Sequence, residues 1–432
     1  MLSQLLLLVP LLVLPTRAEK EVFAHFILGN TAPYSHDDFH ADIKAASDAG
    51  IDGFALNIGG DSFTSASLDA LFAAAESFNR ATGRSFRSFI SFDYAAYPFT
   101  IDDCVTRLLR HSPSPAYFHY NGRPVASTFL GTKAHHDWNE IKRRTNAYFI
   151  PTYSDVWVGE SARYPPVDGL LSWDAWPYHA NVTPATDQHY VEQLKSAGKQ
   201  YMMPVSPWFY TACCGKNWLY NSDQLWPARW QQVFQLRPDF LQLLTWNDYG
   251  ESHYLGPQTT HASSYPQGSK GFNEGMVHSA WLSDLPYYIQ KYKSGNEPVA
   301  GAYNEHLTFW YRRNPKHACG TGGTVCNSKA NGQETFPATD CAADQVNFSV
   351  FTAETAVVTV QIGDGRPRTV TSPTRGSFSG SVPFDGQTGA VKISAQVGPR
   401  TIRTITGPGI TNDCGGLGHV NWNPWVGGGV PS

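Results

Sequence analysis

The sequence predicts a (β/α)8 barrel, or TIM barrel, followed by an all-β sandwich-like domain. Over about the first 295 residues, short apolar runs alternate with amphipathic helical patterns, which is typical of a parallel sheet covered by helices. Eight such units in about 270 residues match a (β/α)8 barrel in number and length. After about residue 298, helical periodicity disappears and Gly, Pro, Ser and Asn turns separate strand-like runs, which indicates a β-sandwich.

Each predicted barrel strand is an apolar run bounded by turn residues. The strands are predicted at residues 22–28, 53–57, 86–92, 124–129, 147–151, 169–173, 201–205 and 240–246. The helices are predicted at residues 37–49, 67–82, 101–110, 136–145, 187–197, 224–236 and 273–292. Further strands are predicted at residues 307–312, 347–352, 356–362 and 391–397. A doubly wound open sheet is the alternative, but it would require a Gly-rich turn after an early strand, and no G-x-G-x-x-G occurs there.

The N-terminus has the pattern of an exported protein. Residues 5–14 are apolar apart from one Pro, and Ala18 offers a small-residue cleavage site, so residues 1–18 are predicted to be a signal peptide. The apolar run is too short to span a bilayer, and no later segment is long enough. We therefore expect no membrane partner and a secreted protein, extracellular or associated with a cell wall. Its domains would be a barrel at residues 19–297 and a β-rich accessory domain at residues 298–432.

Composition narrows the class of partner. The net charge is -4 with 16% charged residues, and no cluster of Lys or Arg marks a nucleic-acid surface, so we expect no nucleic-acid partner. Aromatic residues make up 13% of the chain, which fits either a large core or a sugar-binding cleft. We expect a monomer.

The cysteines and sequons agree with export. Seven cysteines in an oxidising compartment favour disulfides with one thiol left over, and their connectivity stays open. Cys319 and Cys326 resemble half of a zinc site, but no second pair follows, so no metal is expected. Asn181 and Asn347 begin Asn-x-Ser/Thr sequons and are predicted to be glycosylated.

Polar and aromatic residues gather where the predicted strands end, which is where such barrels keep their active site. The residues from the first seven strands are His25, Asn57, Asp93, Tyr94, Tyr153, Asp155, Trp173, Asp174, Trp208 and Tyr210. Each also has a structural interpretation, because an Asp after a strand is often a helix N-cap and a Trp there often packs the rim. Asp93 is harder to explain in this way, since the next helix begins several residues later. The accumulation over many strand ends favours a shared cleft.

The eighth strand ends in TWNDYGES, residues 245–252, which holds Asp248 and Glu251 three residues apart. Trp246 and Asn247 are predicted as a wall and a hydrogen-bond partner of the site, and Gly250 as a sharp turn between the two acids. Carboxylates, amides and Trp without basic residues suit a neutral polyol. G-x-S-x-G and H-E-x-x-H are absent, so the pattern favours glycosidase chemistry, with one carboxylic acid and one carboxylate and no cofactor.

Several motifs together resemble glycoside hydrolase family 71, the fungal α-1,3-glucanases or mutanases. They are VFAHFILGNT (22–31), GIDGFALNIG (50–59), FISFDYAAY (89–97), GRPVASTF (122–129), LLSWDAWP (170–177), MMPVSPWFYT (202–211), KNW (216–218) and TWNDYGESHYLGP (245–257). The resemblance extends from about residue 21 to residue 295, and the C-terminal part also resembles the β-rich domain that accompanies this family.

The resemblance implies endo-hydrolysis of α-1,3-linked glucan by an inverting mechanism. It implies Asp248 and Glu251 as the catalytic pair, assisted by Asp93 through its S-F-D context. His253, in the same last motif, is predicted to bind substrate. Glu251 is favoured as the general acid and Asp248 as the base, with the reverse left open. The chain departs from the family pattern at Cys213-Cys214, before KNW.

Two alternatives stay open beside this interpretation. The chain would otherwise be a glycosidase of another glucan linkage, or a non-catalytic glucan-binding wall protein. The C-terminal domain would bind glucan through exposed aromatics such as Trp422 and Trp425, or would only brace the barrel.

Overall fold

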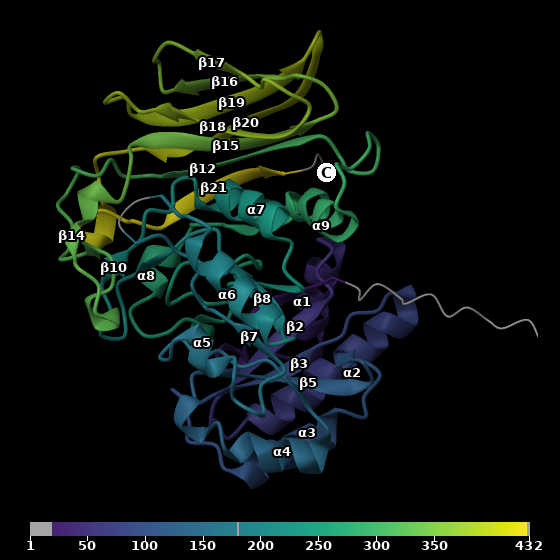
Figure 1. Cartoon of the computed structure of the whole chain (residues 1–432). Helices are drawn as coiled ribbons and strands as arrows, with labels where there is room; N and C mark the ends of the chain where they lie inside the picture. Colours follow the sequence, from purple (N-terminus) through teal and green to yellow (C-terminus); the bar gives the residue numbers. More distant parts are fainter. Residues whose placement is uncertain (1–19, 179–180, 430–432) are drawn as a thin grey trace, which may run out of the picture.

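The computed structural model describes residues 20–178 and 181–429. A mixed α/β part occupies the lower half of the view in Figure 1, and the antiparallel sheets of the C-terminal third lie above it. The predicted signal peptide, residues 1–18, lies outside the described residues. Among the described residues, no helix combines the length and apolar character needed to cross a membrane.

A curled, largely parallel sheet forms the centre of the α/β part. Its parallel strands are β1 (Glu21–Ile27), β2 (Gly53–Ile58), β3 (Phe89–Asp93), β5 (Arg123–Phe129), β6 (Tyr148–Phe149), β7 (Gly169–Leu171), β8 (Gln200–Val205) and β11 (Phe240–Leu243). Each of the eight predicted strands is confirmed, with shifted ends. The sheet order is β4-β5-β3-β2-β1-β11-β8-β7, with β6 beside β5 and β4 (His119–Tyr120) antiparallel to β5. Thr152 forms parallel bridges to Phe129 and to Leu171, so it connects the end of β5 with the end of β7.

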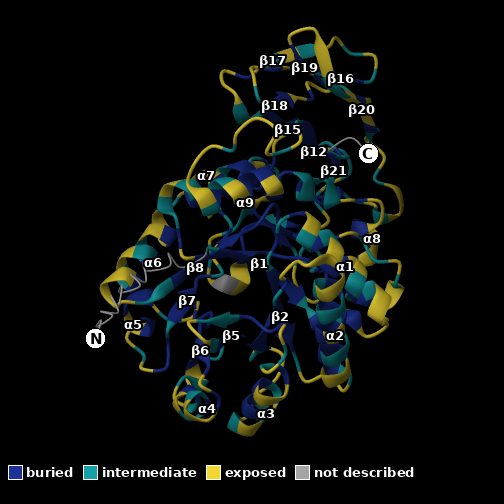
Figure 2. Ribbon diagram, turned by 90° about the vertical axis from the view of Figure 1, so that its right-hand side faces the viewer, coloured by how far each residue is buried: buried dark blue, intermediate teal, exposed yellow. Residues whose placement is uncertain are grey.

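Helices surround this sheet with their exposed faces outward, while the strands inside are buried (Figure 2). They are α1 (His36–Asp48), α2 (Thr64–Thr82), α3 (Ile101–His111), α4 (Asp137–Thr145), α5 (Val158–Ser161), α6 (Ala185–Ser196), α7 (Leu225–Leu236), α8 (Lys270–Asn273) and α9 (Leu285–Ser294). The prediction of one helix over residues 273–292 is wrong. Gly275 has φ 74°, a 3-10 turn covers Ser279–Ser283, and α9 begins afresh with a Pro in its first turn.

A small four-stranded sheet lies between the two parts. Its order is β14-β13-β10-β9, with β9 (Tyr210–Thr211) and β10 (Trp218–Leu219) forming a hairpin and β13 (Val325–Cys326) and β14 (Phe336–Pro337) coming from the C-terminal third. Disulfides join Cys326 to Cys341 and Cys319 to Cys414. The cysteines that resembled half of a zinc site are therefore bonded to other partners.

Two antiparallel sheets form the C-terminal third. One has the order β18-β15-β12-β21 and the other β17-β16-β19-β20. Their bounds are β12 (His306–Arg312), β15 (Gln345–Thr352), β16 (Val357–Ile362), β17 (Arg368–Thr371), β18 (Gly376–Pro383), β19 (Gly389–Val397), β20 (Arg400–Ile410) and β21 (Pro424–Gly429). Val358 and Val360 of β16 alternate with more exposed residues, and both belong to an apolar core that the two sheets share.

Side chains predicted to be exposed on this third are fully or partly buried instead. Trp422 is fully buried, and Trp425 packs against Phe309 and Tyr311, so the prediction of exposed aromatics is wrong. Asn347 is also fully buried, and its Oδ1 accepts a hydrogen bond of 2.7 Å from Gln224, the residue just before α7. A glycan would have no room there, so this predicted glycosylation site is wrong, whereas Asn181 is exposed.

Candidate active site

The segment that follows β11 folds back on itself. The backbone N–H of Thr245 donates to the carbonyl of His253 at 2.8 Å, and the N–H of Leu255 donates to the carbonyl of Thr245 at 2.9 Å. The Thr245 hydroxyl accepts the N–H of Asp248 at 2.9 Å and lies 3.1 Å from His253 Nδ1. This loop brings Asp248, Glu251 and His253 together at the carboxyl end of the parallel sheet.

The two carboxylates share one histidine. His253 Nε2 lies 3.0 Å from Glu251 Oε2 and 3.8 Å from Asp248 Oδ2. Asp248 Oδ1 also accepts the backbone N–H of Glu251 at 3.0 Å. Both carboxylate side chains are 16% exposed, and His253 is fully buried below them. One oxygen of each carboxylate and one ring nitrogen of His253 lie within 4.8 Å of one another.

Lys216 is the fourth member of this group, which the sequence analysis missed. Its Nζ lies 2.5 Å from Glu251 Oε1, and its side chain is half-exposed. The residue lies in the turn between β9 and β10, and the N–H of Tyr210 in β9 donates to the carbonyl of Glu251 at 3.1 Å. Lys216 belongs to the KNW motif, but the sequence did not indicate which element its side chain would face.

The partners give the two carboxylates different ionisation. Burial alone would raise the pKa of Glu251, but the hydrogen bonds and charges of His253 and Lys216 outweigh it and lower the pKa to about 2. Burial and the negative charge of Glu251 raise the pKa of Asp248, against the opposing charges of His253 and Lys216. Glu251 is therefore the carboxylate that stays ionised, and Asp248 is the one that holds a proton more readily.

Asp93 and Asn57 stand at the ends of two other strands of this sheet. Asn57 Nδ2 donates to Asp93 Oδ2 at 3.2 Å, and Asp93 Oδ1 accepts the backbone N–H groups of Ala95 and Ala96 at 2.9 and 3.0 Å. Burial raises the pKa of Asp93 although these hydrogen bonds lower it. The structure thus brings together Asn57 and Asp93, as the sequence predicted, with neutral donors as partners.

His25 lies on β1 inside the curled sheet. Its Nδ1 is 2.9 Å from the side-chain nitrogen of Gln242, which donates to it, and its ring is 4.8 Å from the ring of Trp173, centre to centre. Burial, followed by the charge of nearby His253, lowers the pKa of His25 to about 3. A neutral His25 whose Nδ1 accepts keeps its proton on Nε2.

Six other predicted substrate-binding residues have their side chains engaged elsewhere. Trp246 is buried against Phe54, and both amide atoms of Asn247 bind the backbone of Ile27. The remaining four are held in these ways: Tyr94 by Cys104 of α3 at 3.7 Å, Tyr153 by the ring of Phe149, Trp208 by a hydrogen bond of 3.1 Å to the Trp422 carbonyl, and Tyr210 by the ring of Phe272.

Two of the predicted acids, Asp155 and Asp174, are exposed, and Asp155 accepts a hydrogen bond from Thr132. The chain does turn at residues 249–252, where the sequence predicted a turn at Gly250, but the positive φ of this loop, 56°, belongs to Ser252. Gly250 instead leaves space, since a Cβ there would lie 3.3 Å from Asp248 Oδ1.

Asp248, Glu251 and His253 also have the atoms that a metal ion would need. Within residues 20–178 and 181–429, this is the one group of at least three such side chains whose ligand atoms lie within 4.8 Å of one another. The ammonium of Lys216 already occupies Glu251 Oε1, and it would repel a cation bound to the same carboxylate. The arrangement therefore fits two carboxylates held by Lys216 and His253 better than it fits a bound metal ion.

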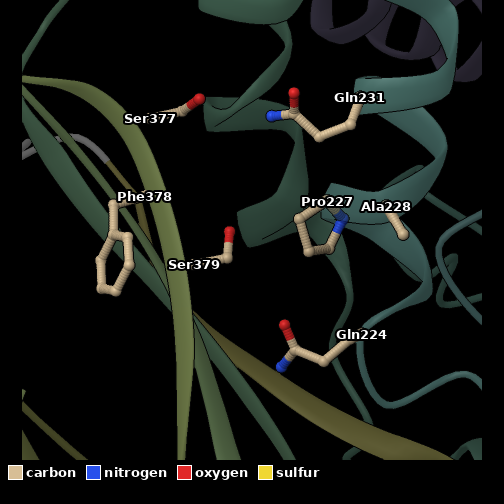
Figure 3. A pocket seen from close by; sticks show the side chains of 7 residues that line it. All are labelled: Gln224, Pro227, Ala228, Gln231, Ser377, Phe378 and Ser379. Atoms are coloured by element: carbon tan, nitrogen blue, oxygen red, sulfur yellow. The ribbon is translucent and has the colours of Figure 1, made fainter. Parts of the chain in front are cut away.

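A separate crevice of about 330 Å³ opens between α7 and β18 (Figure 3). Gln231 of α7 and Gln224, the residue just before that helix, project into it, and Ser377 and Ser379 face them from β18. No charged residue lines the crevice among the described residues, and none of the predicted site residues belongs to it. It lacks the titratable groups that hydrolysis would require.

Comparison with known proteins places this site in a family. The sequence profile of Glycosyl hydrolase family 71 matches residues 18–432. The chain is 34% identical to the glucan endo-1,3-alpha-glucosidase agn1 of Schizosaccharomyces pombe, over 98% of both chains. It is 32% identical to a mutanase of Penicillium rubens, over 95% of this chain and 88% of the relative. It is 31% identical to the ascus wall endo-1,3-alpha-glucanase of S. pombe, over 71% and 74%.

A solved structure is similar in fold. The GH99 endo-alpha-mannosidase of Bacteroides thetaiotaomicron superimposes with a TM-score of 0.50 at 13% identity, over 64% of this chain and 99% of that one. At this identity the likeness concerns the fold and not the reaction. The profile match covers nearly the whole sequence, and relatives above 30% identity align along most of it. The chain therefore belongs to glycosyl hydrolase family 71.

Proposed function

We propose that the protein is a secreted endo-α-1,3-glucanase that hydrolyses the α-1,3-glucan of fungal cell walls as a monomer. The observation that carries the proposal is the carboxylate pair at the end of β11, where Asp248 and Glu251 share His253 but differ in ionisation. The names of two relatives support the α-1,3 linkage. Two disulfides in the described part of the chain agree with an oxidising, extracellular location.

We also propose that the curled sheet is a complete (β/α)8 barrel over residues 19–297. Support comes from its eight parallel strands and from Thr152, which forms parallel bridges to the ends of β5 and β7. Residues 298–432 would form the β-rich accessory domain. A bracing role suits it, because Asp284 of the α/β part binds His306 at 3.0 Å and Thr308 at 2.7 Å, all three buried.

Asp248 is proposed as the general acid and Glu251 as the base, the reverse of the assignment favoured from sequence. A general acid needs a raised pKa, and a base needs to be ionised at the working pH. The environment of Asp248 meets the first condition and that of Glu251 the second. Asp93, Asn57, His25 and Trp173 would line the sugar site on the other strands.

The proposal also covers the stereochemistry of hydrolysis at the anomeric carbon. The family resemblance implies inversion, in which the two carboxyl groups stand about 6.5–9.5 Å apart so that water fits between them. Oxygens of Asp248 and Glu251 lie within 4.8 Å, nearer to a retaining pair. We propose inversion with the bound glucan separating the two groups. Proton NMR of the first product tests this, because an α-linkage must then release the β-anomer.

The activity itself is tested on a panel of α-1,3, α-1,4, β-1,3 and β-1,4 glucans. Release of reducing oligosaccharides from α-1,3-glucan alone is the expected result. Release from a different glucan would establish a glycosidase of another linkage. Binding to α-1,3-glucan without any product would establish a non-catalytic wall protein. The Asp248→Asn/Glu251→Gln double variant serves as the folded, inactive control.

A further inference from the structure

We propose that Cys213 and Cys214, adjacent in the chain, form a third disulfide that fastens the turn carrying Lys216. The sulfur atoms of the two residues lie 3.0 Å apart. That separation is shorter than a contact between two unbonded sulfur atoms and about 1 Å longer than the S–S bond. A small displacement of two side chains therefore suffices to form the bond. The functional half of this inference rests on the proposed function, whereas the bond itself does not.

The backbone around the pair is already a tight turn. Cys214 and Gly215 have φ of 57° and 78°, and the N–H of Lys216 donates to the carbonyl of Cys213 at 2.8 Å. The turn joins β9 to β10. A bond between neighbouring cysteines closes a small ring around their peptide group, and this ring is compatible only with a compact turn.

The cysteine inventory leads to the same pairing. Of seven cysteines, four form the two disulfides of the C-terminal third, and Cys104, Cys213 and Cys214 are left. Cys104 is buried in α3, where its Sγ contacts the hydroxyl of Tyr94. It has no sulfur partner among the described residues. A bond between Cys213 and Cys214 leaves one buried thiol, which is the single odd cysteine expected of an exported chain.

The bond forms by ordinary thiol–disulfide exchange. Cys214 is exposed, so its thiolate attacks a disulfide-bonded oxidant of the secretory pathway and releases one thiol from it. Cys213 then attacks the sulfur of Cys214 and releases the second thiol. The two cysteines lose two protons and two electrons, and the oxidant's disulfide is reduced to two thiols. Burial and the neighbouring Cys214 raise the pKa of Cys213 to about 12, so Cys213 is seldom a thiolate and the exposed Cys214 makes the first attack.

The position of the pair connects it with the carboxylates. Cys213 Sγ lies 3.6 Å from the carbonyl of Gly250, between Asp248 and Glu251 in the sequence. Lys216, whose Nζ is 2.5 Å from Glu251, follows two residues after Cys214. Fixing the turn limits the positions open to Lys216 and so preserves its contact with Glu251. In this account the cysteine pair is a positioning element, and it does not touch the substrate.

Counting thiols in the full-length, unreduced protein tests the bond without reference to activity. After denaturation in the presence of an alkylating agent, one alkylated cysteine per chain, Cys104, is expected. The peptide that contains residues 213 and 214 should be unalkylated and lighter by two hydrogen atoms. The Cys104→Ser variant, as a matched control, should give no alkylated cysteine. Three alkylated cysteines in the wild-type protein, Cys213 and Cys214 among them, would overturn the proposal.

A double-mutant cycle tests the connection to Lys216. The Cys213→Ser/Cys214→Ser variant should lose up to about tenfold in kcat, because Lys216 is held less firmly. Combined with Lys216→Met, the cysteine changes should add almost nothing to the loss from Lys216→Met alone. Fully additive losses would overturn the positioning role and leave the thiol count to decide the bond. If the panel shows no activity at all, the proposed function fails while the thiol count still stands.

Discussion

The two sides of the candidate site hold their carboxylates in different ways. On the β11 side, Glu251 contacts two groups that carry or accept positive charge, Lys216 and His253, and its pKa falls to about 2. On the β3 side, the hydrogen bonds to Asp93 come from neutral donors, and the charge of Lys216 lowers its pKa less than they do, so burial leaves the pKa raised. The same sheet presents both acids. The difference shows that the ionisation of a strand-end carboxylate is set by the loop and hairpin packed over it.

The largest effects are expected on the β11 side. Asp248→Asn and Glu251→Gln should each lower kcat on α-1,3-glucan by about a thousandfold or more, since each removes a proton-transfer group. Asp248→Asn should keep activity on an α-1,3-glucosyl fluoride substrate, because fluoride leaves without being protonated. Glu251→Gln should instead be restored by azide, which attacks without a base. Product analysis by mass spectrometry and NMR measures both.

This pair of variants can reverse the assignment. Azide rescue of Asp248→Asn, with retained fluoride hydrolysis by Glu251→Gln, would make Glu251 the acid and Asp248 the base. Thermal unfolding of Asp248→Asn should stay close to that of the wild type, because an amide of nearly the same shape replaces the carboxylate. Glu251→Gln should unfold at a somewhat lower temperature, because it loses the ionised carboxylate that pairs with Lys216 and His253.

A smaller effect is expected on the β3 side. Asp93→Asn should lower kcat/KM by about a hundredfold if Asp93 assists the reaction through a charge or a hydrogen bond to the sugar. Asp102→Asn, which changes an exposed acid paired with Arg144 on the surface, is the matched control and should leave kcat/KM unchanged. An Asp93→Asn variant as active as this control would restrict the chemistry to the β11 side.

The sequence predicted the parts of the fold that have a strong local period. Eight apolar runs and six helical patterns appear as strands and helices, because burial of a strand or of one helix face imposes its pattern directly on the chain. The last predicted helix failed at Gly275, where a positive φ interrupts a pattern that periodicity alone would continue. There the backbone conformation of a glycine interrupted the helix although the apolar spacing continued.

The site was only partly predictable for a related reason. Asp248, Glu251 and Asp93 could be proposed from the sequence because they lie at, or a few residues after, the ends of buried strands. Neighbouring aromatics could not be assigned to the cleft or to the helix layer, since a strand that ends irregularly no longer alternates its faces, and Trp246 packs against Phe54. Lys216 was missed because it reaches Glu251 from the β9–β10 turn, whose short strands give no periodic signal.

The smallest of these effects tests the comparison of the two sides most directly. Lys216→Met should lower kcat by about tenfold near neutral pH, and it should move the acid limb of the pH–rate profile upward by about one unit or more. The sign follows from the charge: Lys216 lowers the pKa of Glu251, so its removal lets Glu251 take up a proton at a higher pH. Lys291→Met, which breaks a surface pair with Glu297 of the same 2.5 Å length, should move neither kcat nor the acid limb. An unchanged acid limb in Lys216→Met would mean that Glu251 owes its low pKa to His253 alone, and that the hairpin side contributes position but not charge.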